Sequence, residues 1–287
     1  MLKKLAPIAI ILFLAIRFCN AQVIEPQGPE EWSKPYQPFR VVGNLYYVGT
    51  YDLACYLIAT PSGNILINTG LANSLPIIRD NIETLGFRFA DTRILLTTQA
   101  HHDHTGAIAA IKKMTGAKLM VHEKDAAVMA DGGKSDFAFG GAASIFEPVA
   151  VDRVLHDRDT IRLGDATVTI LHHPGHTKGS SSFMMDISDG TATYKTLIVN
   201  MPSIVVAKPF GQVTQYHDIA RDYAYTFEAL KKLQFDLWLS SHASQFNLHS
   251  KHQPGDPYNP AKFKDRQGYD KAVADLEEAY RKKLQSK

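Results

Sequence analysis

Cysteine is scarce in this sequence of 287 residues, which contains only Cys19 and Cys55. Cys19 lies in an N-terminal segment that we expect to be removed, as argued below. The mature chain then keeps a single cysteine, which excludes an internal disulfide even in an oxidising compartment. A chain of this length can bury a large core without one.

Long hydrophobic runs are also missing. The apolar run Leu5–Ile16 is about a dozen residues long, whereas a membrane-spanning helix needs roughly 20. It follows two lysines and precedes small side chains at Cys19 and Ala21, which is typical of a cleavable signal peptide. We therefore expect a signal peptide at residues 1–21. Residues 22–287 would form the mature domain, located in the periplasm and free of the membrane after cleavage.

Two alternatives to a cleaved signal peptide use the same segment. An uncleaved anchor is disfavoured because the apolar run is short and a polar segment follows it. A lipid attached at Cys19 is disfavoured because Arg17 and Phe18 are poor residues just before a lipidated cysteine.

An excess of charge of one sign is missing as well. The full chain has 31 lysines and arginines against 29 aspartates and glutamates. Lys3, Lys4 and Arg17 lie in the expected signal peptide, which has no acidic residue. The mature chain therefore has 28 basic and 29 acidic residues and a net charge of −1. This balance gives no electrostatic basis for nucleic acid as a partner.

No Pro/Gly/Ser-rich linker and no block of charge divides the chain after a proline-rich arm at residues 22–39, so we expect one domain. Strands with hairpin turns come first and then alternate with helices, which favours an α/β sandwich with sheets inside and helices outside. Strands are expected at residues 45–50, 54–59, 65–67, 93–97, 118–121, 168–171, 196–199 and 236–240, helices at 75–85, from 105 onward, at 218–233 and at 269–285, and a long mobile loop at 131–148.

Candidate metal ligands follow three of the expected strands. His101, Asp103 and His104 follow one strand, His176 follows a second and His242 follows a third. Loops at strand ends are where a rigid scaffold presents chemistry. Imidazole and carboxylate ligands suit zinc, and catalytic zinc keeps one position open for water. The pattern therefore indicates one zinc centre that is built from distant parts of the chain.

The remaining histidines have plainer interpretations. Alternation along an extended loop would turn His102 away from the ligands. His172 and His173 are expected to pack or to orient ligands. Ordinary surface or core positions are expected for His122, His156, His217, His249 and His252.

Two short motifs resemble those of the metallo-β-lactamase superfamily. They are HHDHTG at residues 101–106 and GHTKGS at residues 175–180. The family pattern is H-x-H-x-D-H, then the G-H-T-x-G-S histidine, then a late histidine after a strand; here Gln99 stands at the first position. The resemblance covers nearly the whole mature chain. It implies an αβ/βα sandwich of two central mixed sheets flanked by helices.

Residues 199–203, VNMPS, narrow the resemblance. They lack the bridging Asp found in glyoxalase II and the tRNA-processing nucleases, and Met201 stands near the zinc-binding Cys of the B1 and B2 β-lactamases. The chain thus resembles subclass B3. Gln99, the NMPS segment and the opening EWSKPYQPFR resemble the GOB-type branch of that subclass. Two departures are the lack of a C-terminal cysteine pair and Asn68, where the superfamily commonly has Asp.

The resemblance implies two zinc sites. Glutamine binds zinc only through a neutral carbonyl oxygen, a weaker donor than imidazole, so we expect the site that contains Gln99 to be the looser one. The alternative is that Gln99 only hydrogen-bonds a water or another ligand. The first site would comprise Gln99, His101 and His176, and the second Asp103, His104 and His242.

The implied function is zinc-dependent hydrolysis of the β-lactam amide of penicillins, cephalosporins and carbapenems, which are small-molecule substrates, and hence antibiotic resistance. Zinc supplies a nucleophile at neutral pH, and the catalytic role of Asp103 is to orient it. No S-x-x-K motif of the serine β-lactamases is present. By position, substrate contacts are expected at Trp32, Phe139, Ile145 and Ser203, with ordinary packing as the alternative for the aromatic residues.

Two other functions stay open. One is hydrolysis of another ester, thioester or lactone by the same fold, and the other is zinc binding without catalysis. We expect a monomer. We also expect the loop at residues 131–148 to be a flexible lid, in which Phe137, Phe139 and Phe146 cover a bound substrate.

Overall fold

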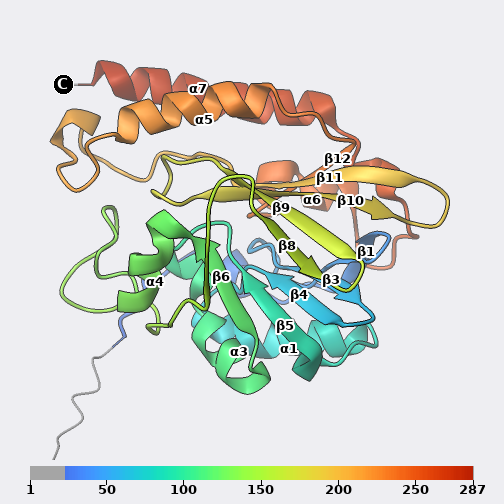
Figure 1. The fold of residues 1–287 in the computed structure, drawn as a ribbon. Helices are drawn as coiled ribbons and strands as arrows, with labels where there is room; N and C mark the ends of the chain where they lie inside the picture. Colours follow the sequence, from blue (N-terminus) through green and yellow to red (C-terminus); the bar gives the residue numbers. More distant parts are fainter. Residues whose placement is uncertain (1–22, 287) are drawn as a thin grey trace, which may run out of the picture.

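The computed structural model describes residues 23–286. The expected signal peptide at residues 1–21 lies outside them and stays a prediction. Within the described part of the chain, no helix is long and apolar enough to cross a membrane. The fold consists of two β-sheets packed face to face, with helices on both outer sides (Figure 1).

The first sheet has seven strands that pair in chain order. Its first four strands are antiparallel and the last four run parallel, so the sheet is mixed. A tight turn joins β3 to β4, where Gly63 has a φ of +116° that L side chains rarely adopt. The strands are β1 (Phe39–Val42), β2 (Leu45–Tyr47), β3 (Tyr56–Thr60), β4 (Gly63–Ile67), β5 (Thr92–Leu96), β6 (Lys118–His122) and β7 (Arg153–Leu155).

The second sheet has five strands in the order β12-β11-β10-β9-β8. It is also mixed, because β12 runs parallel to β11 while the other neighbours are antiparallel. The two mixed sheets confirm the expected sandwich. The strands are β8 (Thr160–Leu163), β9 (Ala166–His172), β10 (Ser181–Ser188), β11 (Thr193–Val199) and β12 (Leu237–Ser240).

The helices form two outer layers. In Figure 1, α1 and α3 lie outside the first sheet, and α5 and α7 lie along the second. Ile78 and Ile82 of α1 are fully buried, as the helical spacing predicts. The helices are α1 (Leu75–Thr84), α2 (His102–Thr105), α3 (Ile108–Thr115), α4 (Ala126–Asp131), α5 (Ile219–Lys231), α6 (Leu248–Lys251) and α7 (Arg266–Gln285), with short 3-10 turns at Glu30–Trp32, Ala72–Ser74, Phe89–Asp91, Glu123–Asp125, Phe210–Gln212, Ser244–Phe246 and Pro260–Phe263.

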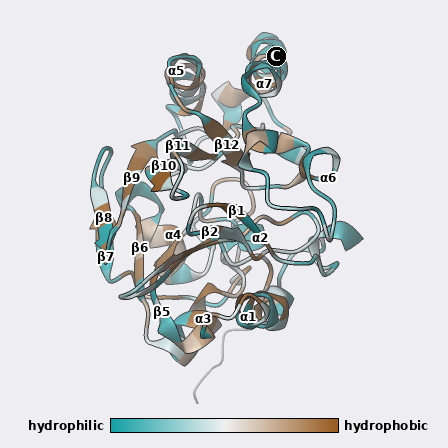
Figure 2. Cartoon of the chain, turned by 90° about the vertical axis from the view of Figure 1, so that its right-hand side faces the viewer, coloured by the Kyte–Doolittle hydropathy of each residue, from teal (hydrophilic) through white to brown (hydrophobic). Residues whose placement is uncertain are grey.

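Two hydrophobic cores hold these layers together. The larger core lies between the two sheets and continues under α5 and α7, and it includes Phe183 and Trp238. The smaller core joins the first sheet to α1 and α3 and includes Leu66 and Ile111. Figure 2 shows hydrophobic colouring along β10 to β12, in the middle of the molecule. Four strands were not expected from the sequence: β1, β7, β8 and β10.

The expected loop at residues 131–148 is indeed without helix or strand after α4. However, Phe146 is fully buried in the smaller core, and Phe137 lies in the larger one. These two rings therefore pack into the cores and not over the ligands, and the motion of the loop stays a prediction. Phe139, which is 40% exposed, remains at the surface.

Candidate metal centre

The loops after β5, β9 and β12 meet at Thr98. The backbone N–H of Ser181, at the start of β10, donates to the Thr98 carbonyl oxygen at 2.8 Å. The Ser241 hydroxyl, just after β12, donates to the Thr98 hydroxyl at 2.9 Å. These contacts join the two sheets at one edge, where the candidate ligands lie.

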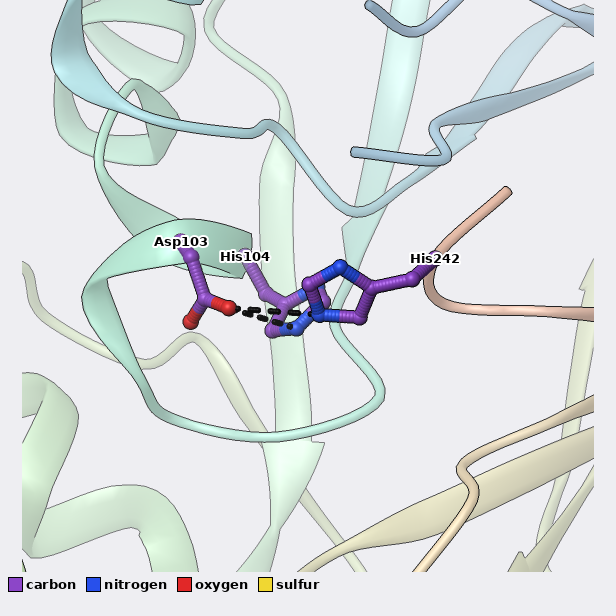
Figure 3. Close-up of side chains that lie close together, drawn as sticks. All are labelled: Asp103, His104 and His242. Atoms are coloured by element: carbon purple, nitrogen blue, oxygen red, sulfur yellow. Dashed lines mark ion pairs between the residues drawn. The ribbon is translucent and has the colours of Figure 1, made fainter. Parts of the chain in front are cut away.

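Asp103, His104 and His242 form one compact cluster (Figure 3). One ligand atom from each lies within 4.8 Å of the others. The Asp103 Oδ2 atom is 3.3 Å from the Nε2 atoms of both His104 and His242. Asp103 and His104 come from the single turn α2, so the chain presents two ligands side by side, and β12 brings the third. A carboxylate and two imidazoles form a suitable donor set for zinc.

Asp52 supports this cluster from behind. Its Oδ2 atom is 3.0 Å from Nδ1 of His242, and its Oδ1 accepts the backbone N–H of Ser244 at 2.8 Å. A carboxylate on the far nitrogen of a histidine fixes the ring and leaves Nε2 for a metal. Burial lowers the pKa of His242, but hydrogen bonds to Asp103 and Asp52 outweigh it and raise the pKa to about 9.

Asp103 is anionic at neutral pH. Burial raises the pKa of this carboxyl group, but the neighbouring His104 and His242 outweigh burial and hold the pKa well below its ordinary value. Burial lowers the pKa of His104, so this ring favours the neutral form that a metal requires. Once a cation displaces the proton of His242, the cluster presents the negative charge of Asp103 toward it.

His101 and His176 form a second pair nearby, with ring centroids 4.9 Å apart. Nδ1 of His176 lies 2.8 Å from the Ser203 carbonyl oxygen, to which it can only donate, so Nε2 is left as an acceptor. Burial, together with the charge of His101, lowers the pKa of His176 to about 3. Nε2 of His101 is 3.3 Å from Oδ2 of Asp136. Gln99 precedes His101 by two residues, and its side chain is buried.

Several buried polar atoms here have no hydrogen-bond partner within residues 23–286. They are Oε1 of Gln99, Nδ1 of His104 and both ring nitrogens of His102. Nε2 of His101 and Nε2 of His104 each have a carboxylate oxygen 3.3 Å away as their nearest partner. A buried polar atom without a partner costs roughly 1–3 kcal/mol, so such a group of orphaned atoms is expected where an ion is bound. The donor chemistry and these orphaned atoms both fit zinc.

His102 lies in a helical turn and not in the expected extended loop. It begins the helical turn α2, so alternation along an extended loop does not apply. It is buried between Trp32 and Phe139, with ring centroids 6.2 and 6.0 Å away, and it is outside the ligand cluster of Figure 3.

Three of the four expected substrate contacts lie beside the ligands. The Trp32 ring is 5.6 Å from that of His242, and the Phe139 ring is 4.8 Å from that of His101. The Ser203 hydroxyl oxygen is 3.2 Å from Nδ1 of His176. Ile145 packs in the smaller core, so its contact with a substrate stays a prediction.

Three carboxylates that hold the ligands were not identified from the sequence: Asp52, Asp125 and Asp136. Each acts over a long sequence separation or through backbone groups, and no motif marks them. Asn68 could be identified from the sequence, because the superfamily commonly has Asp at this position. Its φ of 62° is left-handed, which Asn tolerates, and its Oδ1 accepts the Thr98 N–H at 2.9 Å. Asn68 therefore helps to fix the entry to the ligand stretch.

Comparison with known proteins identifies the family of this chain. A model of the metallo-β-lactamase superfamily matches residues 49–189. The class B3 di-zinc metallo-β-lactamase LRA-12 from an Alaskan soil metagenome is 61% identical, with a TM-score of 0.90 over 91% of this chain and 100% of that one. The metallo-β-lactamase GOB-18 from Elizabethkingia meningoseptica is 55% identical, with a TM-score of 0.90 over 92% of this chain and 98% of that one.

More distant relatives differ in the activity that their names give. A hydroxyacylglutathione hydrolase of Bradyrhizobium sp. is 29% identical over 50% of this chain and 47% of its own length. A β-lactamase-like protein 2 homolog of Drosophila melanogaster is 26% identical over 56% of this chain and 62% of its own length. The chain thus spans about half or somewhat more of the length of these curated relatives.

Proposed function

Since the chain belongs to the metallo-β-lactamase superfamily and to its class B3, we propose that it is a zinc-dependent β-lactamase. The observation that carries the proposal is the buried cluster of Asp103, His104 and His242, in a chain 61% identical to a class B3 di-zinc enzyme along that enzyme's whole length. The reaction breaks the carbon–nitrogen bond of the β-lactam amide. Water adds its oxygen to the carbonyl carbon and a proton to the ring nitrogen.

The residues divide the work as follows. Asp103, His104 and His242 hold one zinc ion. Bound zinc supplies a nucleophile at neutral pH and a Lewis acid that polarises the amide carbonyl. The Oδ2 atom of Asp103 faces the two histidines. This leaves Oδ1 to accept a hydrogen bond from the attacking water and to hold its proton.

The second zinc site comprises Gln99, His101 and His176, as in the GOB-type branch. The support for Gln99 is its buried Oε1 atom, which has no hydrogen-bond partner among the described residues. An amide oxygen is a neutral donor, and the two histidines are neutral when they bind metal. This site is therefore the weaker of the two.

Substrate lies over the metal centre between Trp32 and Phe139, whose rings flank the ligand histidines. The Ser203 hydroxyl hydrogen-bonds the substrate carboxylate, and Ile145 contacts the substrate from the loop at residues 131–148. Penicillins, cephalosporins and carbapenems share the amide and the carboxylate that these groups address, so carbapenems are included as substrates.

The enzyme is exported through the signal peptide at residues 1–21 and acts as a monomer in the periplasm, where β-lactams arrive. The low cysteine content is compatible with this location, because the mature chain needs no disulfide for its core. Mass spectrometry of the protein from a periplasmic extract tests the location and the cleavage of the signal peptide, since cleavage after Ala21 leaves a chain that begins at Gln22.

Thioester hydrolysis is the second candidate, because a hydroxyacylglutathione hydrolase is among the relatives. The test is turnover of a penicillin, a cephalosporin, a carbapenem and a glutathione thioester, each with and without a chelator. We expect hydrolysis of the β-lactams that the chelator abolishes and added zinc restores. Thioester turnover that exceeds β-lactam turnover would replace the proposal. Zinc binding without any turnover would indicate a non-enzymatic protein.

A further inference from the structure

Asp125 is a buried carboxylate that, unlike Asp52 and Asp136, touches no candidate ligand side chain. It lies in the 3-10 turn Glu123–Asp125 after β6, and it is 2% exposed. Burial of an ionised carboxylate is costly unless hydrogen bonds compensate for the lost water. Its contacts therefore indicate what the structure gains from it.

All three hydrogen-bond partners of Asp125 are donors, and they come from two loops. Its Oδ2 accepts the backbone N–H of Ala100 at 3.1 Å and the hydroxyl of Thr177 at 2.7 Å. Its Oδ1 accepts the backbone N–H of Gly179 at 2.8 Å. Three donors favour the ionised carboxylate. Burial raises the pKa of Asp125 to about 6, so the group is still mainly ionised at neutral pH.

These two loops carry the uncharged candidate ligands Gln99, His101 and His176. Ala100 lies between Gln99 and His101, and Thr177 directly follows His176. The carboxylate thus bridges the loop after β5 to the loop after β9, one residue away from each of the three ligands. None of its hydrogen-bond partners lies on the loop that carries His242.

The packing around Asp125 leaves little freedom at this bridge. A Cβ atom placed on Gly179 would be 2.6 Å from Cγ and 2.7 Å from the backbone N of Asp125. Real Cβ atoms essentially never approach this closely, so the loop after β9 can lie against the carboxylate only with glycine at this position. The distance between the two ligand loops is therefore fixed by direct contact as well as by hydrogen bonds.

We propose that Asp125 is a positioning residue for the site of Gln99, His101 and His176, which sets the spacing of these three ligands and hence the zinc affinity of that site alone. Asp125 is not one of the assigned ligands, and it acts through Ala100, Thr177 and Gly179. The inference rests on the proposed function, since it takes these three residues as a zinc site.

The test is zinc titration of Asp125→Asn by calorimetry, with Asp52→Asn as the matched control. Both changes keep the shape of a side chain that supports one ligand group, buried in the case of Asp125 and partly exposed in the case of Asp52. The binding event that Asp103→Ala removes identifies the site of Asp103, His104 and His242. We expect Asp125→Asn to weaken the other event about tenfold or more, the usual effect of losing a group that orients ligands, and to leave the identified event within about threefold. Asp52→Asn should do the reverse.

Circular dichroism in chelator separates this effect from misfolding. If Asp125→Asn does not fold, Thr177→Val removes one of the three hydrogen bonds and keeps the carboxylate; it should weaken the same event several-fold. The inference is overturned if the folded variant binds both zinc ions as the parent does, or if both sites weaken equally. A parent that hydrolyses β-lactams with only one zinc, even in excess zinc, would overturn this inference but leave the proposed function standing.

Discussion

The two halves of the metal centre are built differently. Asp103 and His104 come from one helical turn, and His242 is fixed by direct contact with Asp52. Gln99, His101 and His176 come from the loops after β5 and β9, which belong to different sheets. Asp125 accepts hydrogen bonds from backbone N–H groups and one hydroxyl group of these loops. One half thus has its negative charge on a ligand, while the other has carboxylates only beside its ligands, with Asp136 against Nε2 of His101 and Asp125 against the backbone of the two loops. From this comparison we expect local chain geometry and ligand charge together to decide which half binds zinc first.

Removing a ligand from the charged half should have the largest effect. Asp103→Ala and His242→Ala each leave two of its three ligands, and Asp103→Ala also removes the group that orients the water. We expect both variants to lose turnover of every β-lactam. Steady-state hydrolysis combined with measured zinc content is the check. Near-normal turnover with zinc still bound stoichiometrically would refute the assignment of these ligands.

The loop that carries His176 should be sensitive to acid because of His173. This ring is buried, with Nδ1 2.7 Å from the Ser182 hydroxyl, and burial lowers its pKa to about 3. A histidine that is neutral when folded stabilises the protein above pH 6.5, and this contribution is lost as the pH falls from 6.5 toward 3. The loss amounts to about 1.4 kcal/mol per pH unit.

Urea unfolding in chelator at several pH values measures this loss, with His173→Gln as the control that cannot ionise. The free energy of unfolding of the parent should fall more steeply below pH 6.5 than that of the variant. Parallel curves would mean that His173 does not contribute to acid sensitivity.

The smallest expected effect concerns the mobility of the loop at residues 131–148, in which Phe139 lies beside His101. Since Phe137 and Phe146 are buried, mobility should be confined to the exposed tip at residues 138–143. Hydrogen exchange of the free enzyme should show fast exchange at the tip and slow exchange near Phe146. Uniformly fast exchange would restore the larger lid that the sequence suggested, and uniform protection like that of the core strands would exclude any lid.

The sequence predicted those parts that depend on local pattern. Asp103, His104 and His242 each follow a strand, and these strands were recognisable from short buried runs. The burial of Phe137 and Phe146 was not predicted, because glycines nearby suggest mobility while the burial of the rings depends on distant strands. Asp52 escaped notice for a similar reason, since it is 190 positions from His242 along the chain. Contacts of this kind follow from the packing of the two sheets and leave no local signal.

The most direct test of the inequality between the two halves is zinc titration by calorimetry of the parent and of Gln99→His. A divalent cation gains more from the carboxylate of Asp103 than from an amide oxygen, so the parent should show two separated binding events, with the site of Asp103 filling first. Replacing the amide by imidazole should tighten the later event and bring the two together. If the parent binds two zinc ions with equal affinity and Gln99→His changes nothing, the two halves are equivalent and the account is contradicted.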